Sequence, residues 1–210
     1  MKTDDLIAAL AADTLPRPRV TGQVMRALLG AAFASMVAFA LMWGMRADIW
    51  AALASVALLK TFVPLGVVAL ALAVALALAH PGRLPQRESM ALAGVLGVAA
   101  LTFCAALVQG GVGALVAALS TPSLFVCLTS IPALAIPLLG ALLWGLSSGA
   151  VLNPKRAGAV AGLTAGAAAA ALYSLYCDKD MVLFVLPAYG TAISVVVLAG
   201  ALLGPHALKW

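Results

Sequence analysis

Charge is the scarcest feature of this 210-residue sequence. Twelve lysines and arginines and seven aspartates and glutamates make up 9% of the chain, whereas 65% of it is hydrophobic. A soluble domain of this size carries about 25% charged and 45–50% apolar residues. A water-soluble fold of this length cannot bury so much apolar surface, so lipid must be the main solvent. The composition therefore predicts an integral membrane protein.

The interiors of the long apolar runs contain no ionisable residues, which transporters, channels and membrane enzymes tend to keep there. The nearest is Lys60, at the edge of one run, where an ammonium group can snorkel to the interface. The sequence also lacks a HExxH motif, a phosphate-binding loop and a Ser/His/Asp set. Its two histidines and three cysteines do not have the spacing of a zinc motif. We therefore expect a protein that is not an enzyme and has no cofactor.

Six apolar segments are each long enough to cross a hydrocarbon core of about 30 Å, which takes roughly 20 helical residues. They lack the alternation typical of the short strands of a membrane β-barrel. The expected fold is all-α, a polytopic bundle of six transmembrane helices in residues 23–210, preceded by a cytoplasmic segment, 1–22. The expected spans are 27–45, 61–79, 90–108, 124–144, 157–176 and 181–203.

Two stretches between these spans are ambiguous. Residues 48–60 have a helical pattern and could form an interfacial helix leading into the second span. Residues 110–123 are apolar but rich in glycine, and they end at Thr121 and Pro122, where a helix is expected to break. We expect a loop with a short surface helix there; the alternative is a longer or re-entrant third segment.

The distribution of basic residues predicts the orientation. Six spans place both termini on one side, where nine lysines and arginines fall, while Arg46, Lys60 and Lys179 fall on the other. Positive residues accumulate on the cytoplasmic side of membrane proteins, so both termini are expected in the cytoplasm. The net charge of +5 includes no basic run interleaved with aromatic residues, so direct binding of nucleic acid is not expected.

Small residues recur on the fifth span. Gly158, Gly162 and Gly166 follow one another at intervals of four, as in the GxxxG motif that lets helix backbones approach closely. This pattern predicts a packing face, whose partner could lie in the same chain or in a second copy. In the fourth span, Pro132 and Pro137 each remove a backbone donor and should kink the helix.

The polar start of the chain, MKTDDLIAALAADTLPRP, has the pattern of a short amphipathic helix. Thr3 can cap it, and Asp4 and Asp5 fall in the first turn, where carboxylates complement the helix dipole. A helix of about 11 residues is marginal alone in water. It therefore needs a surface, either a groove on a partner protein or the membrane face of its own bundle. Its apolar stripe consists of Leu6, Ile7 and Leu10.

The three cysteines differ in their surroundings. Cys104 lies in the middle of the third span, where a lone cysteine behaves as a small buried hydrophobe. Cys127, near the start of the fourth span, and Cys177, in the loop YSLYCDKD, are both expected at the outer face, where an oxidising compartment permits disulfides. The pair could be a structural disulfide, a reversible redox pair or a thiolate site for a soft metal ion. Local residues do not decide between these chemistries.

Three blocks of the sequence resemble the integral-membrane anti-sigma factors of the negative-regulator-of-sigma-F (NrsF) type. They are MKTDDLIAALAADTLP, CLTSIPALAIPLLGALL from Cys127 onwards, and NPKRAGAVAGLTAGAAAAALYSLYCDKD with the tail GALLGPHALKW. The resemblance covers essentially the whole chain. It implies a six-span protein of the bacterial inner membrane whose cytoplasmic N-terminus sequesters an extracytoplasmic-function sigma factor.

The resemblance also implies roles for individual residues. Cys127 and Cys177 would face the periplasm and sense a stress, with heavy metals or oxidants as the usual candidates, and Asp4, Asp5 and Leu6 would belong to the sigma-contacting segment. The family often has histidine before the second cysteine, where this chain has Tyr176, which weighs slightly toward redox chemistry. Two other functions compete with this one: a small transporter or channel, and a membrane assembly subunit whose N-terminal helix docks another partner.

Overall fold

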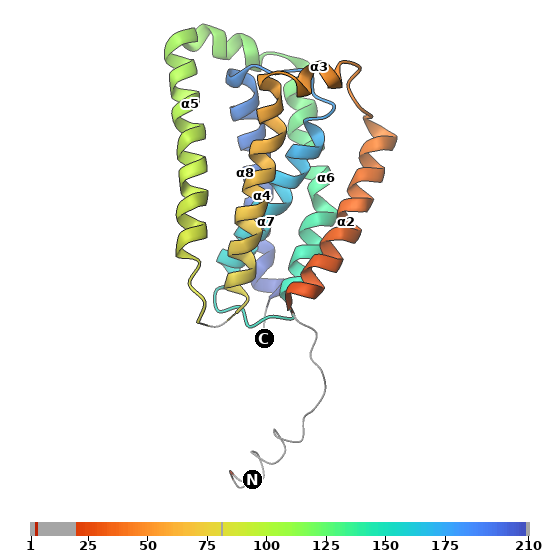
Figure 1. The fold of residues 1–210 in the computed structure, drawn as a ribbon, viewed down its shortest axis with the longest axis vertical. Helices are drawn as coiled ribbons and strands as arrows, with labels where there is room; N and C mark the ends of the chain where they lie inside the picture. Colours follow the sequence, from red (N-terminus) through yellow and green to blue (C-terminus); the bar gives the residue numbers. More distant parts are fainter. Residues whose placement is uncertain (1–2, 4–19, 81, 209–210) are drawn as a thin grey trace.

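The long apolar runs form helices that pack side by side (Figure 1). The computed structural model describes Thr3, residues 20–80 and residues 82–208. Within these ranges the protein is all-α, as predicted. The elements are α2 (Val20–Met42), α3 (Ile49–Leu53), the 3-10 turn η1 (Val56–Leu58), α4 (Leu59–Leu78), α5 (Gln86–Leu119), α6 (Pro122–Leu146), α7 (Pro154–Tyr173) and α8 (Val182–Ala207).

Five helical segments of the described chain are long and apolar enough to cross a membrane: α2, the continuous η1–α4 segment Val56–Leu78, α5, α6 and α8. The protein is therefore a polytopic helical membrane protein. The remaining predicted span, 157–176, corresponds to α7, a 20-residue helix that is rich in alanine and glycine and less apolar than the other five. The six-span prediction is thus confirmed for five segments on length and hydropathy.

The least apolar long helix occupies the centre of the bundle. Twelve of the 20 residues of α7 are buried, and it packs against α4, α6 and α8. Small side chains allow this, because a helix of alanine and glycine can be approached closely from several sides. At the periphery, α5 has Leu92 as its one buried residue, so most of its apolar surface faces outward. Outward-facing apolar surface of this kind is typical of a protein solvated by lipid.

The glycine repeat of α7 lies directly against α8. A Cβ atom on Gly162 would come 2.5 Å from the carbonyl oxygen of Val196, and one on Gly166 would come 3.3 Å from the Cα atom of Ile193. A Cβ atom on Gly158 would collide with the backbone of Gly200, which is itself a glycine. The partner of the repeat is therefore a helix of the same chain, and glycines on both helices permit the close approach.

Helix α2 is attached to α6 at two levels. Near the start of α2, Val24 fits against Gly145, where an added Cβ atom would come within 2.8 Å of Val24. Midway along, the buried Ser35 hydroxyl donates a hydrogen bond of 3.0 Å to the carbonyl oxygen of Leu134. The residue that follows α2 by four positions, Arg46, reaches the opposite end of the bundle. The segment from α2 to Arg46 therefore contacts both α6 and that end of the bundle.

The two ambiguous stretches form short helical pieces. Helix α5 is interrupted at Gly111, whose φ of 73° and ψ of 169° are not helical, and a second helical piece then continues to Leu119 across the end of the bundle (Figure 1). This agrees with the predicted short surface helix. Residues 48–60 do not form one interfacial helix, because α3 ends at Leu53 and η1 precedes α4.

Successive long helices run in alternating directions, so their ends fall into two groups (Figure 1). The loops after α4 and after α6 meet at one end, where the amide of Ala150 donates to the carbonyl of Ala79 at 3.0 Å. The start of α2 and the end of α8 lie at this same end (Figure 1). The loop between α7 and α8 lies at the opposite end, where the amide of Arg46 donates to the carbonyl of Leu175 at 3.0 Å.

Candidate functional site

Two of the three cysteines meet at the end of the bundle that carries the α7–α8 loop. Cys127 lies on the second turn of α6 and is 0% exposed, and Cys177 lies in the loop and is 4% exposed. Both cysteines belong to one buried core cluster. The Cys127 thiol donates to the hydroxyl of Tyr173 at 3.5 Å, and the Cys177 thiol donates to the carbonyl oxygen of Lys179 at 3.9 Å. All three cysteines of the chain are free thiols. The structure thus brings together residues 50 positions apart as a reduced pair.

Tyrosine rings surround the pair. The ring of Tyr189, on α8, is edge-on to that of Tyr173, with 6.2 Å between the centroids. Tyr189 lies in the same buried cluster as Cys177, and its hydroxyl has no hydrogen-bond partner among the described residues. The thiol pair is therefore enclosed by α6, α7 and α8 and shielded from solvent.

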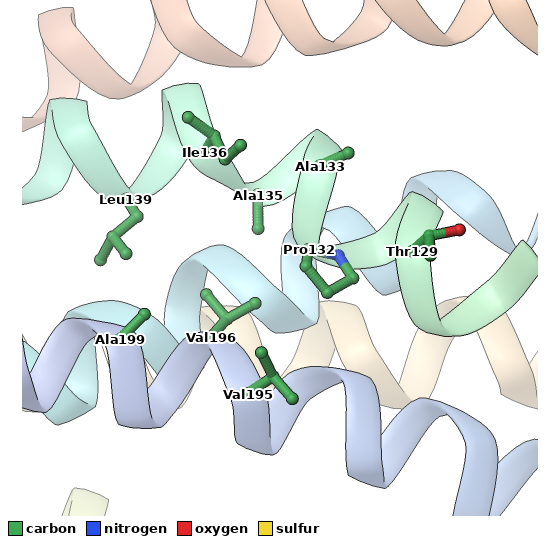
Figure 2. A pocket seen from close by; sticks show the side chains of 9 residues that line it. All are labelled: Thr129, Pro132, Ala133, Ala135, Ile136, Leu139, Val195, Val196 and Ala199. Atoms are coloured by element: carbon green, nitrogen blue, oxygen red, sulfur yellow. The ribbon is translucent and has the colours of Figure 1, made fainter. Parts of the chain in front are cut away.

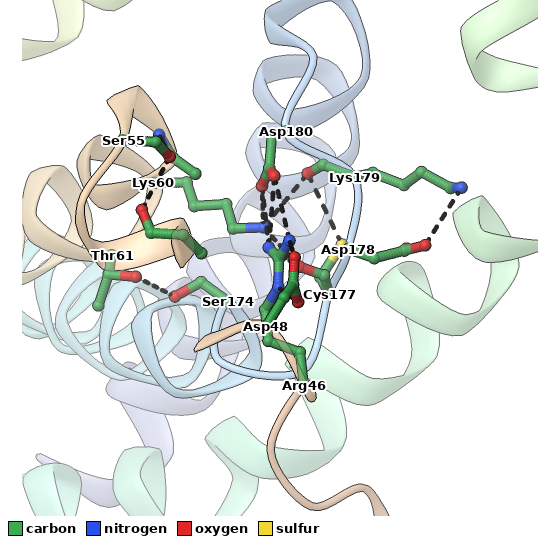
Figure 3. A network of polar contacts seen from close by, with 12 residues as sticks. Arg46, Asp48, Ser55, Lys60, Thr61, Ser174, Cys177, Asp178, Lys179 and Asp180 are labelled. Atoms are coloured by element: carbon green, nitrogen blue, oxygen red, sulfur yellow. Dashed lines mark hydrogen bonds and ion pairs between the residues drawn. The ribbon is translucent and has the colours of Figure 1, made fainter. Parts of the chain in front are cut away.

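The backbone of the same loop is held by two cations, one at the start of α4 and one in the connection between α2 and α3 (Figure 3). Lys60, at the start of α4, donates to the carbonyl oxygen of Cys177 and to the carboxylate of Asp180, both at 2.5 Å. Arg46 donates to the same carbonyl oxygen at 3.1 Å and to Asp180 at 3.2 Å. Arg46 also forms a two-pronged pair with Asp48, at 2.6 and 2.7 Å. We call Arg46, Asp48, Lys60 and Asp180 the loop clamp.

The loop clamp balances two positive charges with two negative ones. Its cations are largely withdrawn from solvent, with 8% of the Arg46 side chain and 6% of the Lys60 side chain exposed, whereas its carboxylates remain in partial contact with solvent. Burying a charge is costly unless it is paired and hydrogen-bonded. The carbonyl oxygen of Cys177 and the two carboxylates supply that pairing, so the loop conformation and the cation positions depend on each other.

These contacts shift the titration of the groups outside the membrane-spanning helices. Burial raises the pKa of Asp180, but hydrogen bonds from Lys60 and Arg46 and the two positive charges outweigh it and lower this pKa below 3.8. The hydrogen bond from Arg46 likewise lowers the pKa of Asp48. Hydrogen bonds to Asp48 and then Asp180 raise the pKa of Arg46. Arg46, Asp48 and Asp180 are therefore ionised at neutral pH.

The environment of Cys177 favours its thiolate. The hydrogen bond from the Cys127 thiol lowers the pKa of Cys177 below the ordinary value of 9.0. Burial opposes this effect, while the backbone of Lys179 and the positive charge of Lys60 add to it. A hydrogen bond to the charged form of a group stabilises that form. Cys177 therefore forms the thiolate, which is the nucleophilic form of cysteine, more readily than an ordinary thiol does.

The donor set around the pair contains few metal ligands. No group of three or more His, Cys, Asp or Glu side chains that could hold a metal ion occurs among the described residues. Two adjacent thiols can still form a disulfide by oxidation or hold a soft cation by themselves. The arrangement of the two thiols is therefore compatible with both disulfide formation and the binding of a soft metal ion.

The structure adds detail to one expectation from the sequence and corrects another. Lys60 lies at the end of its span, as expected, and its ammonium group is buried against the α7–α8 loop. Cys104 is exposed on the outer face of α5 and is not a buried core residue. The surroundings of both residues depend on which helices pack beside them, and the periodicity of the sequence does not predict which helices become neighbours.

Sequence reasoning also missed the loop clamp. The signal was present in the charge count, because Arg46 and Lys60 are two of the three basic residues expected at that end of the bundle. The third, Lys179, pairs with Asp178 at 3.5 Å in the loop itself. The few charged side chains at one end of an apolar bundle have few partners other than one another, so they are expected to form ion pairs with one another.

The predicted partner-binding segment falls almost entirely outside the described residues. Thr3 is described and is exposed. The other five positions lie outside the described ranges: Asp4, Asp5, Leu6, Ile7 and Leu10.

An apolar groove lies away from the thiols, between α6 and α8 (Figure 2). It is an open groove of about 370 Å³ whose walls are almost entirely apolar. Pro132, Ile136 and Leu139 line it from α6, and Val195, Val196 and Ala199 line it from α8. Apart from the Thr129 hydroxyl it presents no polar side chain, so it offers no chemistry comparable with that of the thiol pair.

Comparison with known proteins gives consistent results over the whole chain. Residues 10–210 match a family model described as negative regulator of sigma F, NrsF. The anti-sigma-F factor NrsF of Caulobacter vibrioides (strain NA1000 / CB15N) is 31% identical over 219 residues, which cover 100% of both chains. No solved structure matches the chain.

Proposed function

Because the chain belongs to the NrsF family of negative regulators of sigma F, and so to a family of anti-sigma factors and not of enzymes, we propose that it is a membrane-bound regulator that sequesters a sigma factor. The partner would be of the sigma F type that the family name specifies, in the extracytoplasmic-function class. The N-terminal segment 1–22 would bind it, through Thr3, Asp4, Asp5, Leu6, Ile7 and Leu10.

The signal would enter at Cys127 and Cys177. The observation that carries this proposal is the meeting of two buried, reduced thiols at the end of the bundle opposite to the start of α2. Oxidation of the pair to a disulfide, or binding of a soft metal ion by the two thiolates, would change the packing of α6 against the α7–α8 loop. That change would release the sigma factor.

The proposed location is the bacterial inner membrane, with six spans and both termini in the cytoplasm. Alternating helices put the basic loops after α4 and α6 at the end where α2 begins. Accumulation of Lys and Arg at this end supports a cytoplasmic location for it. The thiol pair would then face the periplasm, where cysteine oxidation is favoured.

The sensor role is tested by replacing both thiols. Cys127→Ser/Cys177→Ser in the full chain should retain sigma-factor binding and repression but lose induction by oxidant or soft metal, because serine cannot form either product. Sigma-dependent transcription and co-purification of the sigma factor from membranes measure the two properties. Normal induction in the double variant would reject the sensor role.

The binding role of the N-terminal segment is tested separately. Leu6→Asp/Leu10→Asp should abolish co-purification of the sigma factor, because two charges would interrupt the apolar stripe. The double serine variant serves as the matched control, since its N-terminal segment is intact. Undiminished binding by the aspartate variant at the wild-type membrane level would reject this segment as the binding site.

A further inference from the structure

Cys177 is joined to two different groups of helices through two different atoms. Its side chain is buried in the same core cluster as Cys127 of α6 and Tyr189 of α8, and its sulfur donates to the carbonyl oxygen of Lys179 at 3.9 Å. Its carbonyl oxygen accepts hydrogen bonds from Lys60 of α4 and from Arg46, which follows α2 (Figure 3). The residue therefore bridges the thiol pair and the loop clamp.

The loop clamp reaches the helix that adjoins the N-terminal segment. Arg46 contacts the loop through both its guanidinium group and its amide, which donates to the carbonyl of Leu175. Arg46 follows Met42, the last residue of α2, by four positions, and α2 begins at Val20, within the last three residues of the N-terminal segment 1–22. No other helix in the described part of the chain connects the loop to that segment so directly.

We propose that Arg46 and Lys60 are positioning residues that hold α2 and α4 in the repressing arrangement through the carbonyl oxygen of Cys177 and the carboxylate of Asp180. This inference rests on the proposed sensor function and adds its transmission step. When the thiol pair is modified, the backbone of Cys177 moves with its sulfur and the carbonyl leaves the two cations. Arg46 and Lys60 then lose a partner that compensated their burial, and α2 and α4 shift.

In this proposal, the loop clamp transmits the signal after the thiols have been modified. Breaking the clamp by substitution should therefore mimic induction without any modification of Cys127 or Cys177. The same substitutions should act even when both thiols are absent. This order distinguishes a transmission role from an effect of the cations on thiol reactivity, which would require the thiols.

The test uses full-length Arg46→Gln and Lys60→Met variants in cells, each also combined with Cys127→Ser/Cys177→Ser. Both should raise uninduced sigma-dependent transcription roughly tenfold, within the range of about 5- to 150-fold found for allosteric coupling. The rise should persist in the serine background. Lys179→Met is the matched control and should repress as the wild type does, because the Lys179 side chain is 40% exposed and its ammonium group pairs only with Asp178 among the described residues.

Three results would overturn the clamp: unchanged uninduced transcription, a rise that disappears in the serine background, or a rise proportional to loss of the protein from the membrane by immunoblot. The last would make the two residues merely structural. Rescue of repression by Lys60→Arg, which keeps a cationic donor, would support the clamp. If the double serine variant is induced normally, the sensor function itself fails. If that variant is uninducible while the clamp variants behave as wild type, only the clamp fails.

Discussion

At the scale of single residues, the neighbours of Cys177 favour its thiolate. A hydrogen bond from Cys127 to the ionised sulfur and the positive charge of Lys60 both lower the pKa of Cys177. Hydrogen bonding and a nearby positive charge both favour the thiolate, and here they outweigh burial. The asymmetry between two otherwise similar buried thiols therefore comes from their neighbours.

We predict that Cys177 is alkylated with a pH midpoint below 9.0 in protein carrying Cys104→Ser. Cys127→Ala should raise this midpoint toward 9.0, because it removes the largest influence that lowers the pKa. Cys127→Ser keeps a hydroxyl donor and should leave the midpoint low. Mass spectrometry of the alkylated peptide at a series of pH values measures it. Equal midpoints in the alanine and serine variants would contradict the proposed cause.

At the scale of elements, close packing of α7 on α8 determines which glycines tolerate a side chain. Gly162 and Gly200 face the opposing backbone, so an added methyl group meets main-chain atoms that cannot move aside. Gly190 also lies on α8, but an added Cβ atom there meets nothing within 4 Å. The two kinds of glycine look alike in the sequence, and only the position of the facing helix separates them.

Gly162→Val and Gly200→Val should therefore destabilise the bundle, by about 1–3 kcal/mol or more, the usual cost of overpacking a filled interface. Gly190→Ala should be close to neutral. Thermal unfolding in detergent and the level of protein in the membrane measure the difference. If the valine variants are as stable as Gly190→Ala, the α7–α8 contact does not have the close geometry described here.

At the scale of the whole molecule, α7 is less apolar than the other long helices and lies buried at the centre of the bundle. Helices on the outside of a membrane bundle must be apolar because they face lipid, as α2 and α5 do. A central helix meets mostly protein and can be built from alanine and glycine. This explains why hydropathy alone identifies five segments while the alternation of helices through the bundle requires α7 as well.

Fusions of alkaline phosphatase, which needs an oxidising compartment for its disulfides, test this arrangement. Fusions after Met45 and Asp180 should be active, and fusions after Leu84 and Leu208 should be inactive. Fluorescent-protein fusions at the same sites should give the reciprocal pattern. An inactive fusion after Asp180 together with an active one after Leu208 would mean that α7 does not cross the membrane.

Composition and pattern determined the class of this protein on their own. Apolar runs of membrane-spanning length can be satisfied only by helices, so the all-α membrane fold and most helix positions follow from the sequence. The glycine repeat predicted a packing face, and the count of basic residues predicted that Cys127 and Cys177 lie at the same end of the bundle. Tertiary structure decided which partners these features have: α8 for the glycines, Cys127 for Cys177, and the α7–α8 loop for Arg46 and Lys60. Such contacts join residues that are 42 positions apart for Gly158 and Gly200 and 131 positions apart for Arg46 and Cys177, and they form only when the helices pack together.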